Sequence, residues 1–337
     1  MASQELQTNK MGTSQKVKYR IGSRGSKLAL VQSELVAENL RRVNPALSFT
    51  IETKMTAGDY NKVTPLYLFG EKALWTAELD ELLLSGYFDM IVHCLKDMPT
   101  QITAGCAIGA ILKREDPRDA VVMKEGLAFK ALSELPAGSI VGTSSVRRKA
   151  QLKRAFPALL LEDVRGNVPT RLSNLDEADG KMSCVIVAVA GLLRLGLGHR
   201  ITQHLNDTEC LYAVGQGALA IEVRERDSQT IKLLQSMSHW ETTLLCYAER
   251  SLMRTLEGGC SVPIGVSTQW ERNGTMRMKA NLTSVDGEQS LVVEDSSRID
   301  SIDEADEFGR MLASLLIEKG ASSILKNIEL TRSIVNA

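Results

Sequence analysis

A cluster of cations follows two serines in the segment 141–154, which reads VGTSSVRRKAQLKR. The residues SIVG predict a strand and VRRKAQLKRAF predicts a helix, so Thr143, Ser144 and Ser145 fall at the turn between them. The N-terminus of a helix offers unpaired N–H groups and a positive dipole to an anion, and hydroxyls add donors. The same pattern is typical of an ordinary N-cap on a helix with a solvated basic face. Both interpretations stay open on this segment alone.

Three more arginines follow the next predicted strands. Arg165 and Arg171 lie in VRGNVPTR, and Arg194 comes after the apolar run CVIVAVAGLL. Ligands of open α/β sheets bind beyond the carboxyl ends of the strands, which is where these side chains are expected to meet. Because a planar guanidinium can donate two parallel hydrogen bonds to a carboxylate or a phosphate, the pattern predicts a site for a large polyanion.

A second candidate site ends the apolar run MIVHCL and continues as KDMPT. His93, Lys96 and Asp97 stand at the carboxyl end of this predicted strand. A carboxylate at such a place can stabilise a cationic intermediate or transfer protons. A salt-bridged turn is the alternative for Lys96 and Asp97, and we interpret His93 as a structural hydrogen-bonding residue.

Two glycine-containing segments carry weaker signals. In LEGGCSVPIG, Cys260 follows the glycines that end a predicted helix, which suits either an accessible thiol or simple loop geometry. No histidine follows it in the chain, which argues against a papain-like hydrolase. GQGALA at 215–220 matches the dinucleotide fingerprint but continues as a predicted strand instead of opening a helix, so nicotinamide and flavin are not expected. No Walker motif is present, which disfavours a nucleoside triphosphate.

The elements that must position these residues alternate between strands and helices. YRIG, a helix from about residue 26 and FTIETKM form a β-α-β unit, which the helix LWTAELDELLLSG and the runs MIVHCL and CAIGAILK extend into a parallel or mixed sheet. The inward face of the first helix is expected to hold Leu28, Val31, Leu35, Val36 and Leu40. A second α/β unit of the same kind begins after KREDPRDAVVM.

The chain changes character near residue 240. The run LYAVGQGALAIEVRE is expected to be a long β segment, and residues 240–256 predict a helix with one apolar face. Beyond Cys260, Asn-Gly at 273–274 and Asp-Gly at 286–287 predict hairpins, and EADEFGRMLASLLIEKGA predicts an amphipathic helix. We therefore expect a small third α+β domain with an antiparallel sheet.

Composition limits the classes of protein to consider. The 337 residues are enough for two or three domains, and 40 basic against 41 acidic residues argue against generic nucleic-acid binding. Six cysteines without C-x-x-C spacing indicate neither a zinc site nor a disulfide framework, and they fit a reducing compartment. Residues 1–16 resemble neither a signal nor a transit peptide, and no apolar run is long enough to span a membrane. A disordered tail on a cytoplasmic protein is expected.

Taken together, these segments resemble the porphobilinogen deaminase family, also called hydroxymethylbilane synthases. The resemblance covers about residues 18–330 and runs through nine segments in order. They are IGSRGSKLALVQ, TAGD, HCLKDMPT, KREDPRDA, VGTSSVRRKAQL, VRGNVPTRL, AGLLRLG, YAVGQGALAIEVR and ERSLMRTLEGGCSVPIG. The last of these resembles the segment to which the family attaches its cofactor.

The resemblance implies two α/β domains arranged as in type II periplasmic binding proteins, with the active site in the cleft between them, and a small α+β domain. The expected boundaries are a tail at 1–16, domain 1 at 17–114 plus 215–237, domain 2 at 115–214 and domain 3 at 238–337. Domain 1 is expected to be discontinuous because YAVGQGALAIEVR crosses back to it.

The resemblance also implies an activity. Enzymes of this family are transferases of tetrapyrrole and heme biosynthesis that condense four porphobilinogen molecules head to tail, lose ammonia at each step and release linear hydroxymethylbilane by hydrolysis. The chain grows on a dipyrromethane cofactor held by a thioether, and the matching residue here is Cys260. Each pyrrole carries one acetate and one propionate, so the growing chain is a polycarboxylate. The partner implied is porphobilinogen, with no metal, nucleic acid or membrane, and a monomer is expected.

Individual roles carry over by position. Asp97 matches the catalytic aspartate, which stabilises the cationic azafulvene left when ammonia departs, and Arg24 matches a residue that orients substrate or eases that departure. The expected cofactor contacts are Lys96, Cys94, Thr143, Ser144, Ser145, Arg147, Arg148, Arg165, Arg171 and Gln216. The expected substrate contacts are Arg24, Ser26, Arg171 and Arg194. The remaining cations of the opening segment, Lys149, Lys153 and Arg154, are expected to form a solvated face.

Two positions depart from the family's pattern. Cys94 stands where relatives usually have serine, so a weak thiol donor replaces a strong hydroxyl donor. Ala77 stands where relatives usually have lysine, which removes a cation from the cleft region. A weakened or non-catalytic paralogue that only binds anions or pyrroles is therefore the alternative.

Overall fold

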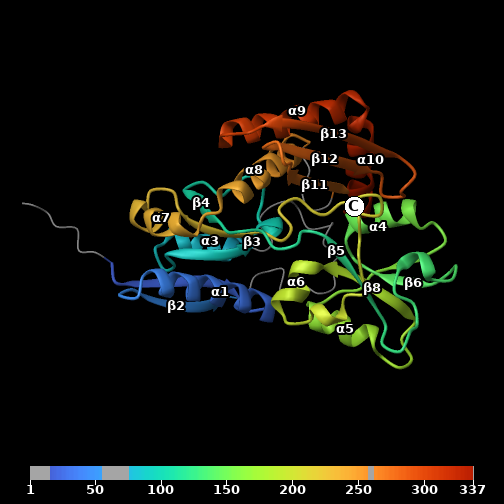
Figure 1. Ribbon diagram of the computed structural model, residues 1–337, viewed down its shortest axis with the longest axis horizontal. Helices are drawn as coiled ribbons and strands as arrows, with labels where there is room; N and C mark the ends of the chain where they lie inside the picture. The colour runs from blue at the N-terminus through green and yellow to red at the C-terminus, as the bar shows by residue number, and fades with distance from the viewer. Residues whose placement is uncertain (1–15, 55–75, 257–261, 337) are drawn as a thin grey trace, which may run out of the picture.

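The computed structural model describes residues 16–54, 76–256 and 262–336, and they form three sheets covered by helices (Figure 1). The expected tail up to residue 15, the segment TAGD and Cys260 lie outside the described residues. Among the described helices, none has the length and apolar character needed to cross a membrane.

The first sheet has the strand order β2-β1-β3-β10-β4. Its strands are β1 (Lys18–Arg24), β2 (Ser48–Lys54), β3 (Met90–Cys94), β4 (Cys106–Ile111) and β10 (Leu219–Arg224). β1 runs parallel to β2 and β3, whereas β10 is antiparallel to both of its neighbours. Helices α1 (Lys27–Val43) and α7 (Ser228–Leu234) pack on one face, and α3 (Ala77–Leu84) packs on the other. The expectation of a mixed sheet is confirmed.

The buried face of α1 differs from the expected one. Val36 and Leu40 are fully buried, but Leu35 is 42% exposed, so its expected inward position is wrong. Gln32 and Ser33 are buried in its place, because each has a polar partner on the sheet. The helical period was correct, and the face is rotated toward polar residues whose partners the sequence pattern does not reveal.

The second sheet repeats this plan, with the strand order β7-β6-β8-β5-β9. Its strands are β5 (Asp119–Met123), β6 (Ile140–Gly142), β7 (Leu160–Glu162), β8 (Met182–Ala188) and β9 (Gln203–His204), and its helices are α4 (Val146–Ala155), α5 (Val168–Leu175) and α6 (Val189–Arg194). Three parallel strands are again followed by an antiparallel one, β5. We had not expected β5, whose five residues are all buried. Two such lobes have the arrangement of type II periplasmic binding proteins.

The chain passes between the two lobes twice, through residues 112–118 and 205–218. The antiparallel strand of each sheet, β5 or β10, directly follows one of these connections. The expectation of β structure throughout 211–225 is wrong in its first half, because residues 214–217 form a turn. Gly215 and Gly217 adopt φ of 70° and 87° there, a conformation that glycine accommodates without strain.

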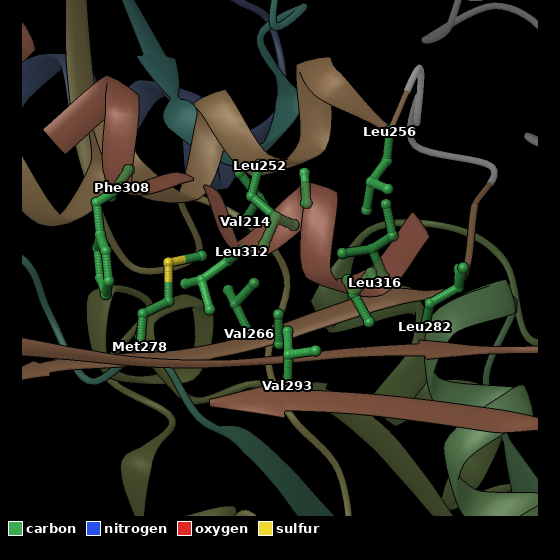
Figure 2. Packing of buried hydrophobic residues seen from close by; sticks show 14 of the residues in the cluster. Val214, Leu252, Leu256, Val266, Met278, Leu282, Val293, Phe308, Leu312 and Leu316 are labelled. Carbon is green, nitrogen blue, oxygen red and sulfur yellow. The ribbon is translucent and has the colours of Figure 1, made fainter. Parts of the chain in front are cut away.

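The third unit is a small α+β layer, as expected. It contains α8 (Trp240–Thr255), β11 (Ile264–Trp270), β12 (Thr275–Thr283), β13 (Ser290–Arg298), α9 (Ile302–Glu318) and α10 (Ala321–Asn336), of which α10 was not expected. The three strands form an antiparallel sheet, with Gly274 and Gly287 in the two hairpin turns. Figure 2 shows Leu252, Phe308 and Leu312 of the helices packed over Met278 and Val293 of the sheet. Val214, from the second connection between the lobes, enters this same core.

Candidate active site

The carboxyl ends of β1 and β3 surround a small cavity in the first lobe. Arg24 ends β1, and Ser26 caps α1 by accepting a hydrogen bond from the backbone N–H of Ala29. Both side chains line a cavity of about 50 Å³ together with Cys94 and Asp97. The structure thus brings the expected catalytic carboxylate and two expected substrate contacts to one place.

A short 3-10 turn, Leu95–Asp97, carries Lys96 and Asp97 beyond β3. Leu95 and Met98 anchor it, because both are buried in a cluster with the end of β4 and the start of β10. Lys96 Nζ donates to Gln216 Oε1 over 3.2 Å. Burial lowers the pKa of Lys96, and the adjacent Asp97 charge opposes that effect.

Cys94 is a poor hydrogen-bond donor in this setting. Burial raises the pKa of its thiol, and the charge of Asp97 raises it further, so the sulfur stays protonated. Its Sγ accepts a hydrogen bond from Gln32 Nε2 at 3.0 Å, and the thiol donates to Oε1 of the same amide over 3.3 Å. The second departure, Ala77, is the exposed first residue of α3.

His93 belongs to the buried structure behind the site, as expected. Its Nε2 lies 2.9 Å from Oε2 of Glu222 on β10, and both side chains are buried. Asp80 of α3 lies close to this pair and hydrogen bonds to Thr103. These groups form a buried polar cluster under α3.

In the second lobe the hydroxyls between β6 and α4 bond to the backbone. Thr143 is fully buried and its Oγ1 accepts from the N–H of Ser145. Ser144 Oγ donates to the carbonyl of Val164 over 2.8 Å, and Ser145 Oγ caps α4 by accepting from the N–H of Arg148. Ser145 is therefore an N-cap, and the Ser144 hydroxyl donates its hydrogen bond to a backbone carbonyl of the protein.

Arg147 and Arg148 share one buried carboxylate. Arg147 Nη2 lies 2.8 Å from Asp119 Oδ2, and Arg148 Nη2 lies 2.7 Å from Asp119 Oδ1. By contrast, Lys149 lies near the exposed Asp163, and Arg154 donates to the backbone of Glu288 on the surface. The five cations of the segment therefore divide into two buried arginines and a more exposed remainder.

Arg165 and Arg171 lie close to Arg148. Burial, together with repulsion by the charges of Arg148 and Arg165, lowers the pKa of Arg171 to about 10. Arg171 Nε donates to the carbonyl of Gly166 over 2.7 Å, which leaves its two Nη groups for other partners. Such concentrated positive charge is suited to a polyanion.

Arg194 joins the two lobes at the second connection. Its Nη2 donates to the carbonyl of Gly217 over 2.6 Å. Burial lowers the pKa of Arg194, and the nearby carboxylate of Glu115 opposes that effect. The Cys94 side chain also lies close to this guanidinium. The end of α6 therefore lies beside the residues that follow β3.

Gln216 sits in the turn that replaces the dinucleotide fingerprint. Its Nε2 donates to the carbonyl of Pro117 over 2.7 Å and to Asp119 Oδ1 over 2.8 Å. Because its Oε1 accepts from Lys96, this one amide connects the first lobe with the second. The turn opens no helix and leads into β10, as the sequence indicated.

Two buried residues of this region were missed by the sequence reasoning. Asp119 is fully buried, and the run DAVVM directly after a Pro-Arg pair could have indicated a strand that begins with a carboxylate. Glu249 of α8 pairs with Arg114 over 2.6 Å and accepts from the N–H of Gly215. No local pattern indicated that pair, since its members lie 135 positions apart.

The fold and the site define a two-lobed α/β protein whose second lobe gathers arginines around the buried carboxylate of Asp119, which Gln216 links to Lys96 of the first lobe. Residues 19–232 match the model of the porphobilinogen deaminase dipyromethane cofactor binding domain, and residues 243–318 match that of the porphobilinogen deaminase C-terminal domain. The chain belongs to the porphobilinogen deaminase family.

Known relatives cover nearly the whole chain. The porphobilinogen deaminase of Yarrowia lipolytica is 51% identical over 318 residues, which are 93% of this chain and 94% of that protein. That of Saccharomyces cerevisiae is 46% identical over 318 residues, 93% of this chain and 97% of that protein. Among solved structures, the periplasmic aliphatic sulphonate binding protein of Escherichia coli aligns with 12% identity and a TM-score of 0.39, covering 90% of this chain and 87% of that one.

Proposed function

We propose that this chain is a hydroxymethylbilane synthase. It would condense four porphobilinogen molecules head to tail onto a covalently held dipyrromethane, lose ammonia at each step and release linear hydroxymethylbilane by hydrolysis, as a transferase of tetrapyrrole biosynthesis. The observation that carries the proposal is the cluster of Arg148, Arg165 and Arg171 in the second lobe, of which Arg148 lies close enough to Lys96 of the first lobe to lower its pKa. A growing polycarboxylate needs such a basic wall next to the acid that assists each condensation.

The residues present fit a dipyrromethane. Its acetate and propionate groups would neutralise the guanidiniums whose mutual repulsion lowers the pKa of Arg171. Arg148, Arg165, Arg171 and Lys96 would hold it, and Cys260 would attach it through a thioether. When bound, the group supplies the pyrrole carbon to which the next unit is joined. Further cofactor contacts are proposed for Cys94, Thr143, Ser144, Ser145, Arg147 and Gln216.

Asp97 is proposed as the catalytic group. Loss of ammonia from porphobilinogen leaves a cationic azafulvene, and a fixed carboxylate near the pyrrole N–H groups stabilises that charge. Arg24 and Ser26 line the same cavity as Asp97 and would orient the substrate carboxylates. Arg194, which approaches Cys94 from the other lobe, would add a further substrate contact.

We also propose a monomer in the cytoplasm that has no nucleic-acid partner. The five cysteines among the described residues are free thiols, which supports a reducing compartment. The net charge of −1 supports a small-molecule partner over a nucleic acid. Light scattering on the purified chain measures the oligomeric state directly.

The covalent cofactor is tested by intact mass under denaturing conditions. The purified protein should carry an added dipyrromethane, and Cys260→Ala should lose it. Cys94→Ser, which alters the thiol nearest the cavity, is the matched control and should keep the added mass. An unmodified but folded wild-type protein, or a modified Cys260→Ala, would contradict the attachment.

The catalytic assignment is tested with Asp97→Asn. Removing one electrostatic stabiliser of a transition state costs about 10²–10³-fold in kcat, and the variant should still fold and keep its cofactor. Asp116→Asn, in the first connection between the lobes, removes a half-buried carboxylate that pairs with the exposed Arg118 and is the matched control. A kcat for Asp97→Asn within a few-fold of wild type would eliminate the assignment.

A non-catalytic pyrrole-binding paralogue is the second candidate. The protonated thiol of Cys94 and the alanine at position 77 favour it, because both weaken contacts expected in an active enzyme. Calorimetric binding of porphobilinogen without formation of any bilane would support this candidate. Turnover that releases hydroxymethylbilane excludes it.

A further inference from the structure

Asp119 is the fully buried first residue of β5, and its carboxylate connects three side chains. Oδ2 accepts from Arg147, while Oδ1 accepts from both Arg148 and Gln216 at 2.7 and 2.8 Å. Gln216 in turn accepts from Lys96 of the first lobe. One carboxylate thus anchors cations that belong to both lobes.

The charges around Asp119 do not balance. Burial alone would raise its pKa, but the guanidiniums of Arg147 and Arg148 hold the pKa of this carboxyl well below its usual range. It is therefore ionised whenever the protein is folded near neutral pH. Two buried guanidiniums share a single negative charge, so this group keeps a net positive charge.

The two arginines use their donors differently. Arg147 makes three contacts within the protein, because it donates to the carbonyl of Leu211 and to Cys210 as well as to Asp119. Arg148 donates once from each Nη, to Asp119 and to the carbonyl of Ile186. In the part of the chain that the structure describes, its buried Nε has no hydrogen-bond partner. Arg148 therefore keeps the larger share of its five donors for another acceptor.

We propose that Asp119 is a positioning residue for the polycarboxylate site, which fixes the guanidinium of Arg148 directly and the ammonium of Lys96 through the amide of Gln216. This inference rests on the proposed function, in which Arg148 and Lys96 bind carboxylates of the pyrrole chain. Arg147 then binds the other carboxylate oxygen, Oδ2, and holds it in place because its guanidinium is itself fixed by a hydrogen bond to the carbonyl of Leu211. Asp119 itself touches no substrate, because it is buried beneath the cations that it orients.

Whether neutralising Asp119 strengthens or weakens polycarboxylate binding distinguishes a positioning role from a purely electrostatic one. By Coulomb's law alone, neutralising an anion beside two cations makes the site more positive and strengthens the binding of a polyanion. Loss of orientation has the opposite effect, because a guanidinium must be held in one plane to bind a carboxylate through paired hydrogen bonds. A more positive site that binds its polycarboxylate more weakly would therefore report positioning.

The test compares Asp119→Asn with Asp116→Asn. We expect the KM for porphobilinogen to rise about tenfold or more in Asp119→Asn, which corresponds to about 1.4 kcal/mol, because a guanidinium that is no longer held in one plane loses its paired hydrogen bonds to a carboxylate. We expect kcat to change less than about threefold, because Asp97 is untouched. Intact-mass spectra at fixed porphobilinogen should also show fewer molecules that carry extended chains. An unchanged or lower KM in folded Asp119→Asn would overturn the proposal.

Two further variants keep the test decisive. If Asp119→Asn fails to fold, Asp119→Asn with Arg147→Met restores the original net charge of the buried group. It is compared with Arg147→Met alone, because Arg147 is itself a proposed cofactor contact, and the double variant must show the higher KM of the two. Arg148→Lys tests the underlying function, since it keeps the charge and loses the planar fork. A raised KM in Arg148→Lys without one in the Asp119 variants would refute only the positioning role. An unchanged KM in Arg148→Lys would overturn carboxylate binding by Arg148, and the positioning role with it.

Discussion

Asp80 is a buried acid whose ionisation near neutral pH lowers the stability of the folded state. Its side chain on α3 is 3% exposed and hydrogen bonds to Thr103 over 2.6 Å. Burial and the nearby charge of Glu222 raise the pKa of Asp80 from 3.8 to about 6, although the hydrogen bond from Thr103 partly opposes the rise. Cys106 also faces this cluster, and burial raises the pKa of its thiol to about 12, so it brings no charge near neutral pH.

The raised pKa determines the sign of the prediction. The folded state binds the Asp80 proton more tightly than the unfolded state does, so this group makes the protein less stable as pH rises from about 4 to about 6, and the full penalty applies above that range. A rise of about two pKa units corresponds to about 3 kcal/mol. Asp80→Asn is always neutral, and it should raise the free energy of unfolding by up to about 3 kcal/mol at pH 8 and by about half of that at pH 5.

Urea unfolding at the two pH values measures this difference. Glu81→Gln is the matched control, because Glu81 is an exposed acid on the same helix and its loss should change stability by less than about 0.5 kcal/mol. A gain for Asp80→Asn that is equal at pH 5 and pH 8 would show that ionisation is not its cause. A loss of stability at pH 8 would refute the reasoning altogether.

The remaining predictions concern the connections between the lobes. Arg114→Met should lower the free energy of unfolding by about 3–5 kcal/mol, because it leaves the buried Glu249 without its countercharge. Arg114→Met combined with Glu249→Gln should lower the free energy of unfolding clearly less. An equal loss of stability in the single and double variants would contradict the pairing argument. Gly217→Ala should reduce the yield of folded protein, measured by circular dichroism and gel filtration, because the new Cβ would lie 2.4 Å from the carbonyl oxygen of Glu115 at a φ of 87°. Gly274→Ala, at a φ of 80° with open space around it, is the control for the φ effect alone and should be the milder variant.

Local patterns predicted the elements whose signals are local. The hairpin glycines at 274 and 287 and the helix predicted over 240–256 follow from neighbouring residues, and the structure confirms them, with the helix at 240–255. At Ser145 the structure shows an N-cap, which was one of the two interpretations that the segment left open. The expected inward position of Leu35 is wrong because an apolar period indicates the buried face of a helix only approximately. Here the buried face includes Gln32, which hydrogen bonds to Cys94. β5 was missed because a short buried run next to prolines and charges resembles a connection.

The partners within the site could not be predicted in the same way. Arg147 and Arg148 are the two buried cations of their segment, but nothing near them in sequence indicates Asp119, which lies 28 positions from Arg147. Gln216 is 97 positions from the same carboxylate. Such contacts depend on how two sheets are placed relative to each other, and a single sequence carries no local record of that placement.

The position of β10 has a consequence for how the protein is made. This strand lies between β3 and β4, yet the ribosome synthesises it about 110 residues after β4. At roughly 5–20 residues per second, synthesis of the intervening chain takes several seconds, during which β3 and β4 lack their common neighbour. The second lobe has no such delay, because all of its strands lie within residues 119–204. Unpaired edges invite pairing with other chains. We therefore expect substitutions that slow folding of the second lobe to increase aggregation of newly made chains, because they prolong the exposure of these edges.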